Sequence, residues 1–168
     1  LDINDYNRVY KELVLFKPDI VFNLAAETHV DRSITNSRDF ILSNILGTFT
    51  LLQATQKYLN NIYKKNKERK FKFIHISTDE VYGSLSKNKK HFTENSNYLP
   101  NSPYSASKAS ADHIVRAWFK TYDFPVITTH CSNNYGPNQN YEKFIPMIIT
   151  NALNHKPITI YGTGTQLR

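Results

Sequence analysis

The amino-acid sequence predicts an α/β fold in which a doubly wound parallel sheet is truncated at both ends of the chain. Strand-like and helical segments alternate along the sequence, an order typical of parallel sheets with crossover helices. The strand-like segments are almost continuous apolar runs, which indicates strands buried on both faces. Polar residues follow three of these strands directly, at the edge where such sheets bind ligands.

The first two predicted elements are a helix and a buried strand. Residues 7–17 have helical spacing, so that Val9, Leu13 and Phe16 can share one face. A proline follows, and residues 20–26, IVFNLAA, have the apolar character of a buried strand. This strand is followed by AAETHVD, the first of the three polar clusters.

A long helix and a second strand come next. Residues 39–65 continue a helical pattern, in which the absence of a side chain at Gly47 permits close approach of another backbone. Residues 71–77, FKFIHIS, suit a buried strand, and a polar stretch over residues 84–102 follows it. The apolar side of the long helix is supplied by Phe40, Ile45, Phe49, Leu52 and Leu59.

The sequence of the second half of the chain predicts four further helices and strands. They are a long helix over residues 102–123, a strand over 126–132, a short helix over 144–153 and a short strand over 158–162. Cys131 is the only cysteine, which excludes an internal disulfide and a zinc site made of thiolates. Its place in a strand favours a buried structural thiol over a nucleophile.

Composition and charge indicate a globular domain without a nucleic-acid partner. The 168 residues are 40% hydrophobic and 13% aromatic, enough to bury a core. The formal net charge of +7 gathers mainly in residues 64–70 and 87–90, which have the character of solvated loops. No interleaved aromatic residues or nucleic-acid motif accompany these cations, so we expect attraction for anionic ligands only.

The sequence also predicts no membrane association. No apolar run approaches the roughly 20 residues that span a bilayer, and no signal peptide is present. We therefore expect a reducing, cytoplasmic compartment. Both ends look cut, since Leu1 has no initiator methionine before it and YGTGTQLR stops just after a turn signal. We expect the chain to be a piece of a larger protein.

One pair of residues predicts acid–base chemistry. Tyr104 and Lys108 are four residues apart at the start of a helix, which puts both side chains on one face. A free tyrosine ionises near pH 10, and a nearby ammonium group favours its phenolate, so the pair could act as a base. Tyrosine and lysine often occur at this spacing by chance, so the pair alone does not establish catalysis.

A second group of polar residues strengthens that interpretation. Thr78, Asp79 and Glu80 follow the strand that precedes the Tyr104–Lys108 helix. Adjacent carboxylates by themselves usually mark a solvated turn or a helix cap. In a doubly wound sheet, however, the end of a strand and the start of the next helix can face one crevice. The combination therefore predicts a site with a tyrosine base, a hydroxyl group and two carboxylates.

These motifs resemble a known group of enzymes over nearly the whole chain. STDEVYG, PYSASK, CSNNYGP, NLAAETHVDRSI and YGTGTQLR are similar to the extended short-chain dehydrogenase/reductase superfamily, and within it to the nucleotide-sugar 4,6-dehydratases. The resemblance implies a Rossmann-like fold and a tightly bound NAD. Related epimerases typically have small residues at Asp79 and Glu80, and related decarboxylases usually keep only the glutamate. The glycine-rich GxxGxxG turn of the superfamily is absent from the sequence.

The resemblance implies a specific division of labour in converting dTDP-glucose or UDP-glucose to the 4-keto-6-deoxy sugar, a step of rhamnose biosynthesis. Tyr104, with Lys108 as its electrostatic partner, would take the 4-hydroxyl proton while NAD accepts a hydride from C4. Glu80 would then take the C5 proton, and Asp79 would protonate the departing 6-hydroxyl. Thr78 would bind the sugar near C4.

The resemblance also implies the binding residues, and it implies no metal site. Expected NAD contacts are Asp2, Ile3, Leu24, Ala25, Ala26, Thr28, Ser43, Tyr104, Lys108 and Asn134. Expected substrate contacts are Thr28, Thr78, Asn133, Lys143, Phe144, Thr159, Tyr161 and Arg168. Lys143 and Arg168 suit a diphosphate, although each taken singly is more simply a surface cation.

The resemblance further implies domain boundaries and a partner. Residues 1–135 would be the central part of the NAD-binding domain, and 136–168 the start of a substrate-binding region. A homodimer would form through the long helices at 39–65 and 102–123. Two alternatives stay open: a nucleotide-sugar epimerase or decarboxylase on the same scaffold, and a non-catalytic NAD-binding protein.

Overall fold

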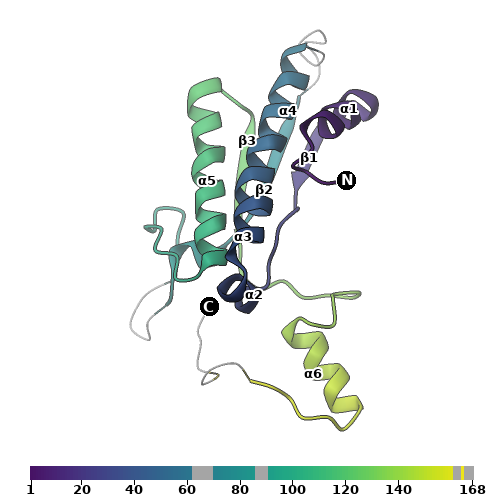
Figure 1. Ribbon diagram of the computed structural model, residues 1–168. Helices are drawn as coiled ribbons and strands as arrows, with labels where there is room; N and C mark the ends of the chain where they lie inside the picture. Colours follow the sequence, from purple (N-terminus) through teal and green to yellow (C-terminus); the bar gives the residue numbers. More distant parts are fainter. Residues whose placement is uncertain (62–69, 86–90, 161–163, 165–168) are drawn as a thin grey trace.

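A sheet of three parallel strands forms the centre of the computed structural model, which describes residues 1–61, 70–85, 91–160 and 164 (Figure 1). The strands are β1 (Ile20–Asn23), β2 (Lys72–Thr78) and β3 (Val126–Cys131), and they lie in the order β1-β2-β3. Asn23, His75 and Thr128 are aligned across the three strands. The predicted parallel sheet with crossover helices is confirmed.

Helices connect the strands and supply most of the buried surface. Helix α5 and helix α4 run side by side over the sheet (Figure 1). A π-helical turn precedes α4 and interrupts the long helix that the sequence predicts. The helical elements are α1 (Tyr6–Phe16), α2 (Val30–Thr35), α3 (Ser37–Phe40), the π-turn η1 (Ile41–Gly47), α4 (Thr48–Asn61), the 3₁₀ turn η3 (Asp79–Tyr82), α5 (Pro103–Tyr122) and α6 (Phe144–Leu153).

The hydrophobic core lies between one face of the sheet and helices α1, α4 and α5. Leu52, Tyr58, Phe73 and Val115 have no exposed surface, and Phe124 packs beside them. Complete burial of one such side chain stabilises the fold by about 1.5–3 kcal/mol. The core therefore fixes β2 firmly against α5, the two elements that carry the predicted catalytic residues.

The opposite face of the sheet is not covered by the described residues. Ile20, Phe22 and Ile127 point to this face, and each is about half exposed. Within the described residues, helices therefore cover only one face of the three strands, as fits a doubly wound sheet of which this chain supplies a part. A continuous apolar run indicates that a strand is buried on both faces in the whole protein, but it does not show which segments cover each face.

Local signals in the sequence explain where helix α5 begins and ends. The Oγ of Ser102 accepts a hydrogen bond from the backbone N–H of Ser105 (3.0 Å), and the Oγ of Ser105 accepts one from the Ser102 backbone (2.9 Å). This reciprocal capping box, with Pro103 in the first turn, starts the helix one residue before Tyr104. Asp123 ends it in a left-handed conformation (φ 50°).

Several details of the sequence prediction are wrong. Phe16, the last residue of α1, is 76% exposed, because helical spacing does not show how far the packing partner extends. Strand β1 ends at Asn23, three residues early, and residues 158–160 are not in a strand. The space at Gly47 admits the side chain of Ile3, whose Cδ1 would lie 2.5 Å from an added Cβ, and not a second backbone.

Candidate active site

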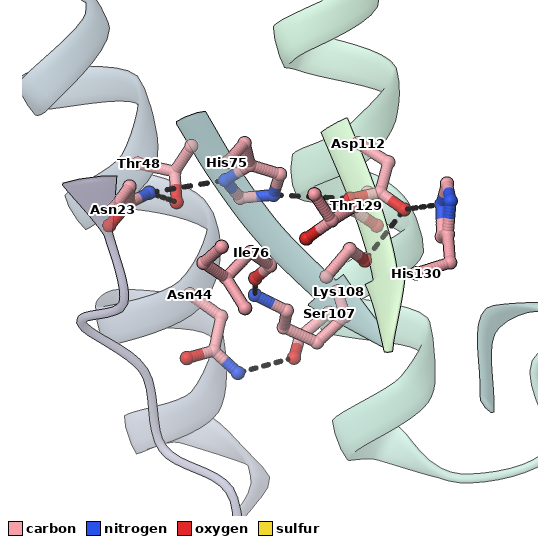
Figure 2. A network of polar contacts seen from close by, with 12 residues as sticks. Asn23, Asn44, Thr48, His75, Ile76, Ser107, Lys108, Asp112, Thr129 and His130 are labelled. Atoms are coloured by element: carbon pink, nitrogen blue, oxygen red, sulfur yellow. Dashed lines mark hydrogen bonds and ion pairs between the residues drawn. The ribbon is translucent and has the colours of Figure 1, made fainter. Parts of the chain in front are cut away.

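The predicted tyrosine–lysine pair is buried where α5 packs against β2. Tyr104 is 8% exposed and Lys108 is 4% exposed. The Nζ of Lys108 donates a hydrogen bond to the carbonyl oxygen of Ile76, at 2.7 Å (Figure 2). Desolvation lowers the pKa of Lys108, and the negative charge of Asp112 opposes this shift. The ring of Tyr104 meets Phe40 edge-on, with centroids 6.3 Å apart. Both side chains are therefore held by packing.

Thr78, Asp79 and Glu80 lie at the carboxyl end of β2, next to the start of α5. The Oγ1 of Thr78 accepts a hydrogen bond from the backbone N–H of Glu80 (3.2 Å) and donates one to Oδ1 of Asp79 (3.3 Å). Thr78 is the N-cap of η3, and the two carboxylates lie in its first turn, where negative charge is favourable. They are only half-buried, however, and α5 packs against η3. The structure thus places these carboxylates on a turn that packs against the helix carrying Tyr104 and Lys108.

The sequence analysis missed Asn44, which connects the loop after β1 to α5. Its Oδ1 accepts from the backbone N–H of Glu27 (2.8 Å), and its Nδ2 donates to the Glu27 carbonyl (3.0 Å) and to Oγ of Ser107 (2.8 Å). Ser107 in turn donates to the carbonyl oxygen of Tyr104 (2.7 Å). Asn44 lies within the π-turn, a distortion frequent at functional sites. A polar residue on the buried side of an apolar helix was the signal that could have identified it.

A second missed residue is Asp112, also on α5. This carboxylate is 4% exposed and accepts hydrogen bonds from side chains of β2, β3 and the loop before α5. Figure 2 shows it between His75 and His130. Next to it, His75 contacts Asn23, whose Nδ2 also donates to Thr48 (3.2 Å), so that the polar contacts continue across the sheet. The signal in the sequence was a charged residue one helical turn after Lys108 on the same face.

The residues expected to contact NAD come from several segments of the chain. Leu24 and Ala25 follow β1 and are exposed, and the neighbouring Ala26 is half-buried. Ser43 is half-buried on the π-turn. The other expected contacts are at the beginning of the chain and after β3: Asp2, exposed and bonded to Asn4 (2.9 Å); Ile3, packed at Gly47; and Asn134, exposed.

The structure brings two of the expected substrate residues together. The Nζ of Lys143 donates a hydrogen bond to Oγ1 of Thr28 at 3.0 Å, although the residues are 115 positions apart. Beside them, Arg32 forms an ion pair with Glu142 at 3.2 Å. Three further expected substrate positions are exposed: Asn133, Phe144 and Thr159. The last two, Tyr161 and Arg168, lie outside the described residues.

Within the described ranges, no group of three or more histidine, cysteine, aspartate or glutamate side chains is placed to hold a metal ion. Cys131 is only half-buried, and its Sγ contacts Oγ1 of Thr129 at 3.8 Å. Among those same residues, no helix combines the length and the apolar character needed to cross a bilayer.

The fold and the site together define the class of this protein. A parallel sheet with a buried tyrosine–lysine pair on the helix after its second strand is the arrangement of an extended short-chain dehydrogenase/reductase. The chain belongs to the GDP-mannose 4,6 dehydratase family, whose family model matches residues 1–168.

Individual relatives of known name also resemble this chain in sequence. The chain is 52% identical over 168 residues to a dTDP-glucose 4,6-dehydratase of Neisseria meningitidis, covering all of this chain and 47% of the relative. It is 50% identical to dTDP-glucose 4,6-dehydratase 1 of Escherichia coli, covering 99% of this chain and 48% of the relative. The chain therefore spans about half the length of the curated relatives it matches.

Solved structures of two different enzymes also resemble this chain. A dTDP-glucose 4,6-dehydratase from Streptomyces venezuelae, solved with NAD and a second ligand, has a TM-score of 0.86 and 41% identity over 98% of this chain and 47% of its own. A UDP-glucuronic acid 4-epimerase from Bacillus cereus, solved with UDP-glucuronic acid and NAD, has a TM-score of 0.83 and 32% identity over 99% of this chain and 48% of its own.

Proposed function

We propose that the protein containing this chain is a nucleotide-sugar 4,6-dehydratase that acts on dTDP-glucose, with UDP-glucose as the alternative substrate. One observation carries the proposal: Thr78, Asp79 and Glu80 lie at the end of β2, where the buried amine of Lys108 binds the preceding carbonyl of Ile76. The base for the oxidation step, Tyr104, and the carboxylates of Asp79 and Glu80 would then act on a sugar bound in one crevice. The identity of about 50% to named dTDP-glucose 4,6-dehydratases supports the choice of substrate.

The residues of the chain fit a bound NAD. Beyond β1, Leu24 and Ala25 are exposed and Ala26 is half-buried, at the carboxyl end of a strand where such sheets bind nucleotides. When bound, NAD would accept a hydride from C4 of the sugar and return it to C6. The residues that would hold it are Leu24, Ala25 and Ala26 along the backbone, Tyr104 and Lys108 at the reacting end, and Asp2, Ile3, Thr28, Ser43 and Asn134 around it.

The proton transfers follow from the ionisable groups at the site. Tyr104 takes the proton of the 4-hydroxyl, because the ammonium of Lys108 favours a phenolate next to it. The 4-ketone acidifies the proton on C5, which Glu80 removes. Asp79 then protonates the 6-hydroxyl, so that water departs. Thr78 hydrogen-bonds the sugar near C4. General base and general acid roles on neighbouring carboxylates require different surroundings.

The experiment is to incubate the full-length protein with dTDP-glucose and, separately, with UDP-glucose. We expect dTDP-glucose to give a 4-keto-6-deoxy product, detected by its absorbance in alkali. Tyr104→Phe is the control, since it should yield no such product. Formation of UDP-galactose from UDP-glucose would establish an epimerase instead. NAD binding without turnover of either sugar would establish a non-catalytic protein.

We also propose that residues 136–168 begin the substrate-binding region and that 1–135 belong to the NAD-binding domain. The contact of Lys143 with Thr28 supports this division, because it brings a cation of the later segment to the edge of the sheet. A cation here suits the diphosphate of a nucleotide sugar. Asn133, Phe144, Thr159, Tyr161 and Arg168 complete the proposed substrate contacts. The product would enter rhamnose biosynthesis in the cytoplasm.

A homodimer through α4 and α5 is the last part of the proposal. A groove of about 610 Å³ lies on these helices, and Phe49, Trp118 and Tyr122 contribute aromatic surface to it. Phe119, on the same helix, is 44% exposed. Surface of this kind suits a second copy of the same helices. Light scattering of the full-length protein at micromolar concentration should show a dimer, and Trp118→Glu should give a monomer.

A further inference from the structure

Asp112 is the centre of a buried cluster of hydrogen bonds beneath the proposed active site (Figure 2). Its Oδ1 accepts from Nε2 of His75 (3.1 Å). Its Oδ2 accepts from Oγ of Ser77 (2.8 Å), from the hydroxyl of Tyr98 (3.0 Å) and from Nε2 of His130 (3.1 Å). A carboxylate that is removed from water is strongly destabilised unless it is satisfied in this way. The fold thus maintains a buried anion at this position.

Asp112 lies in register with the proposed catalytic residues. It follows Lys108 by one helical turn, as Lys108 follows Tyr104. Two successive turns of α5 therefore bind two successive residues of β2. Lys108 binds the carbonyl of Ile76, and Asp112 binds the side chain of Ser77. The next residues of the chain are Thr78, which ends β2, and Asp79 and Glu80 of η3, so these two contacts help to determine where that segment meets the helix.

The histidine nearest to Asp112 does not cancel its charge. Nδ1 of His75 faces the amide nitrogen of Asn23 at 3.2 Å, which leaves Nε2 as the protonated, donating nitrogen of a neutral ring. Desolvation also lowers the pKa of His75. Burial raises the pKa of Asp112, but hydrogen bonds from His130, His75 and Ser77 outweigh burial and hold it below its usual range.

The other ionisable groups around Asp112 are Tyr98, Tyr82, His130 and Lys108. Burial, followed by the negative charge of Asp112, raises the pKa of both tyrosines, so both stay neutral and Tyr98 donates to Asp112. His130 shares its Nε2 between Asp112 and the hydroxyl of Tyr98, the latter at 2.8 Å. Lys108 is the buried amine on the same helix, and its desolvation is offset by Asp112.

We propose that Asp112 is a positioning residue, whose buried carboxylate locks β2 to α5 and supports the ammonium of Lys108 beside Tyr104. The inference rests on the proposed dehydratase function, since it concerns the base of the first oxidation step. It assigns no contact between Asp112 and the substrate. Its effect passes through Lys108 and through the strand that carries Thr78, Asp79 and Glu80.

The test compares Asp112→Asn with Asp123→Asn in the full-length protein. Asp123 is on the same helix, is exposed and occupies a left-handed position that asparagine tolerates. In a single turnover with dTDP-glucose, Asp112→Asn should slow cofactor reduction by about 10- to 100-fold, as expected for a misplaced catalytic group. Substrate affinity should stay unchanged, because Asp112 is buried away from the ligand. The control should match the wild type.

A double-mutant cycle with Lys108→Met separates positioning from a general loss of stability. Because part of the effect passes through Lys108, Asp112→Asn should cause a clearly smaller loss once Lys108 is replaced. Equal losses in both backgrounds, or no loss at all, would overturn the proposal. Ser77→Ala keeps the test valid if Asp112→Asn does not fold. It should slow the same step by about 3- to 10-fold, and a normal rate would again overturn the proposal.

A measurement without substrate distinguishes failure of this inference from failure of the proposed function. In protein labelled with ¹³C-lysine, the Cε shift of Lys108 reports its ionisation. Loss of the nearby negative charge should lower the titration midpoint of Lys108 in Asp112→Asn, but not in Asp123→Asn. An unchanged midpoint would refute the support of Lys108, even if the wild type dehydrates dTDP-glucose. An inactive wild type with a shifted midpoint would refute the proposed function alone.

Discussion

The two halves of the proposed site are held in contrasting ways. Helix α5 buries eight of its residues, among them Tyr104, Lys108 and Asp112, and is bonded to β2 through side chains. Helix α6 buries none. The segment before α6 reaches the rest of the chain through the Arg32–Glu142 ion pair and the contact of Lys143 with Thr28, both near the surface.

This difference concerns how each half is organised. The proposed acid–base groups are fixed by contacts within the described chain, as precise proton transfer would require. The proposed substrate contacts are placed on exposed segments whose positions depend on few interactions. Variants in the first half should therefore change the chemical steps or folding, and variants in the second half should mainly change binding.

The largest expected effect concerns the buried half of the site and comes from replacing its proposed general base, Tyr104. In the full-length protein, Tyr104→Phe should slow oxidation at C4 by about 10²- to 10⁴-fold, the usual contribution of a general base. The absorbance of reduced cofactor in a single turnover measures this step. A near-normal rate would remove Tyr104 from the mechanism. Lys143→Ala is the contrasting variant, and it should weaken substrate binding with little change in the rate at saturation.

The next effect separates the two carboxylates of η3. Glu80→Gln should still allow oxidation at C4 but should block removal of the C5 proton, so reduced cofactor accumulates and solvent deuterium does not enter C5. Asp79→Asn should permit exchange at C5 and slow loss of water by about 10²-fold, because the leaving group lacks an acid. If both variants stop before any cofactor is reduced, the pair serves only to shape the pocket.

A matched pair of phenylalanines tests the contrast in stability. Phe73 has no exposed surface, whereas Phe144 is 54% exposed. Phe73→Ala should lower the free energy of unfolding by about 3–5 kcal/mol through lost packing and a residual cavity. Phe144→Ala should change it by less than about 0.5 kcal/mol. Denaturant titration measures both, and a comparable loss in the two variants would abolish the distinction.

The pH dependence of stability tests the buried polar cluster. Desolvation holds the pKa of His75 below its unfolded value of about 6.5, so the unfolded chain binds a proton more readily. His75 therefore contributes its full stability above about pH 6.5 and loses it as the pH falls below that value. The slope for one proton is at most about 1.4 kcal/mol per pH unit. His75→Gln should flatten the profile of stability in this range.

The smallest effect concerns the surface link of the second half. Arg32 and Glu142 have side chains 57% and 35% exposed, so solvent screens their attraction. Glu142→Gln should cost less than about 1 kcal/mol in unfolding free energy, and high salt should abolish the difference. A loss as large as that of Phe73→Ala would mean that this segment is held as firmly as the core.

Several features could be predicted from the sequence because their causes are local. The spacing of Tyr104 and Lys108 follows from helical geometry, and the capping box at Ser102 and Ser105 is contained within four residues. Helix α6 has the predicted bounds for the same reason. The resemblance of the motifs then indicated the family, which the family match confirms. The roles of the individual site residues stay predictions.

Only the tertiary structure decided which distant residues meet. Asn44 binds Ser107 across 63 positions, and His75 binds Asp112 across 37. No local pattern pairs them, because a buried polar side chain takes whatever partner the packing of its elements provides. The same holds for Ile3 against Gly47 and for the uncovered face of the sheet. Burial depends on how the helices and strands pack together. The sequence shows which residues prefer to be buried, but it does not show which neighbouring residues will cover them.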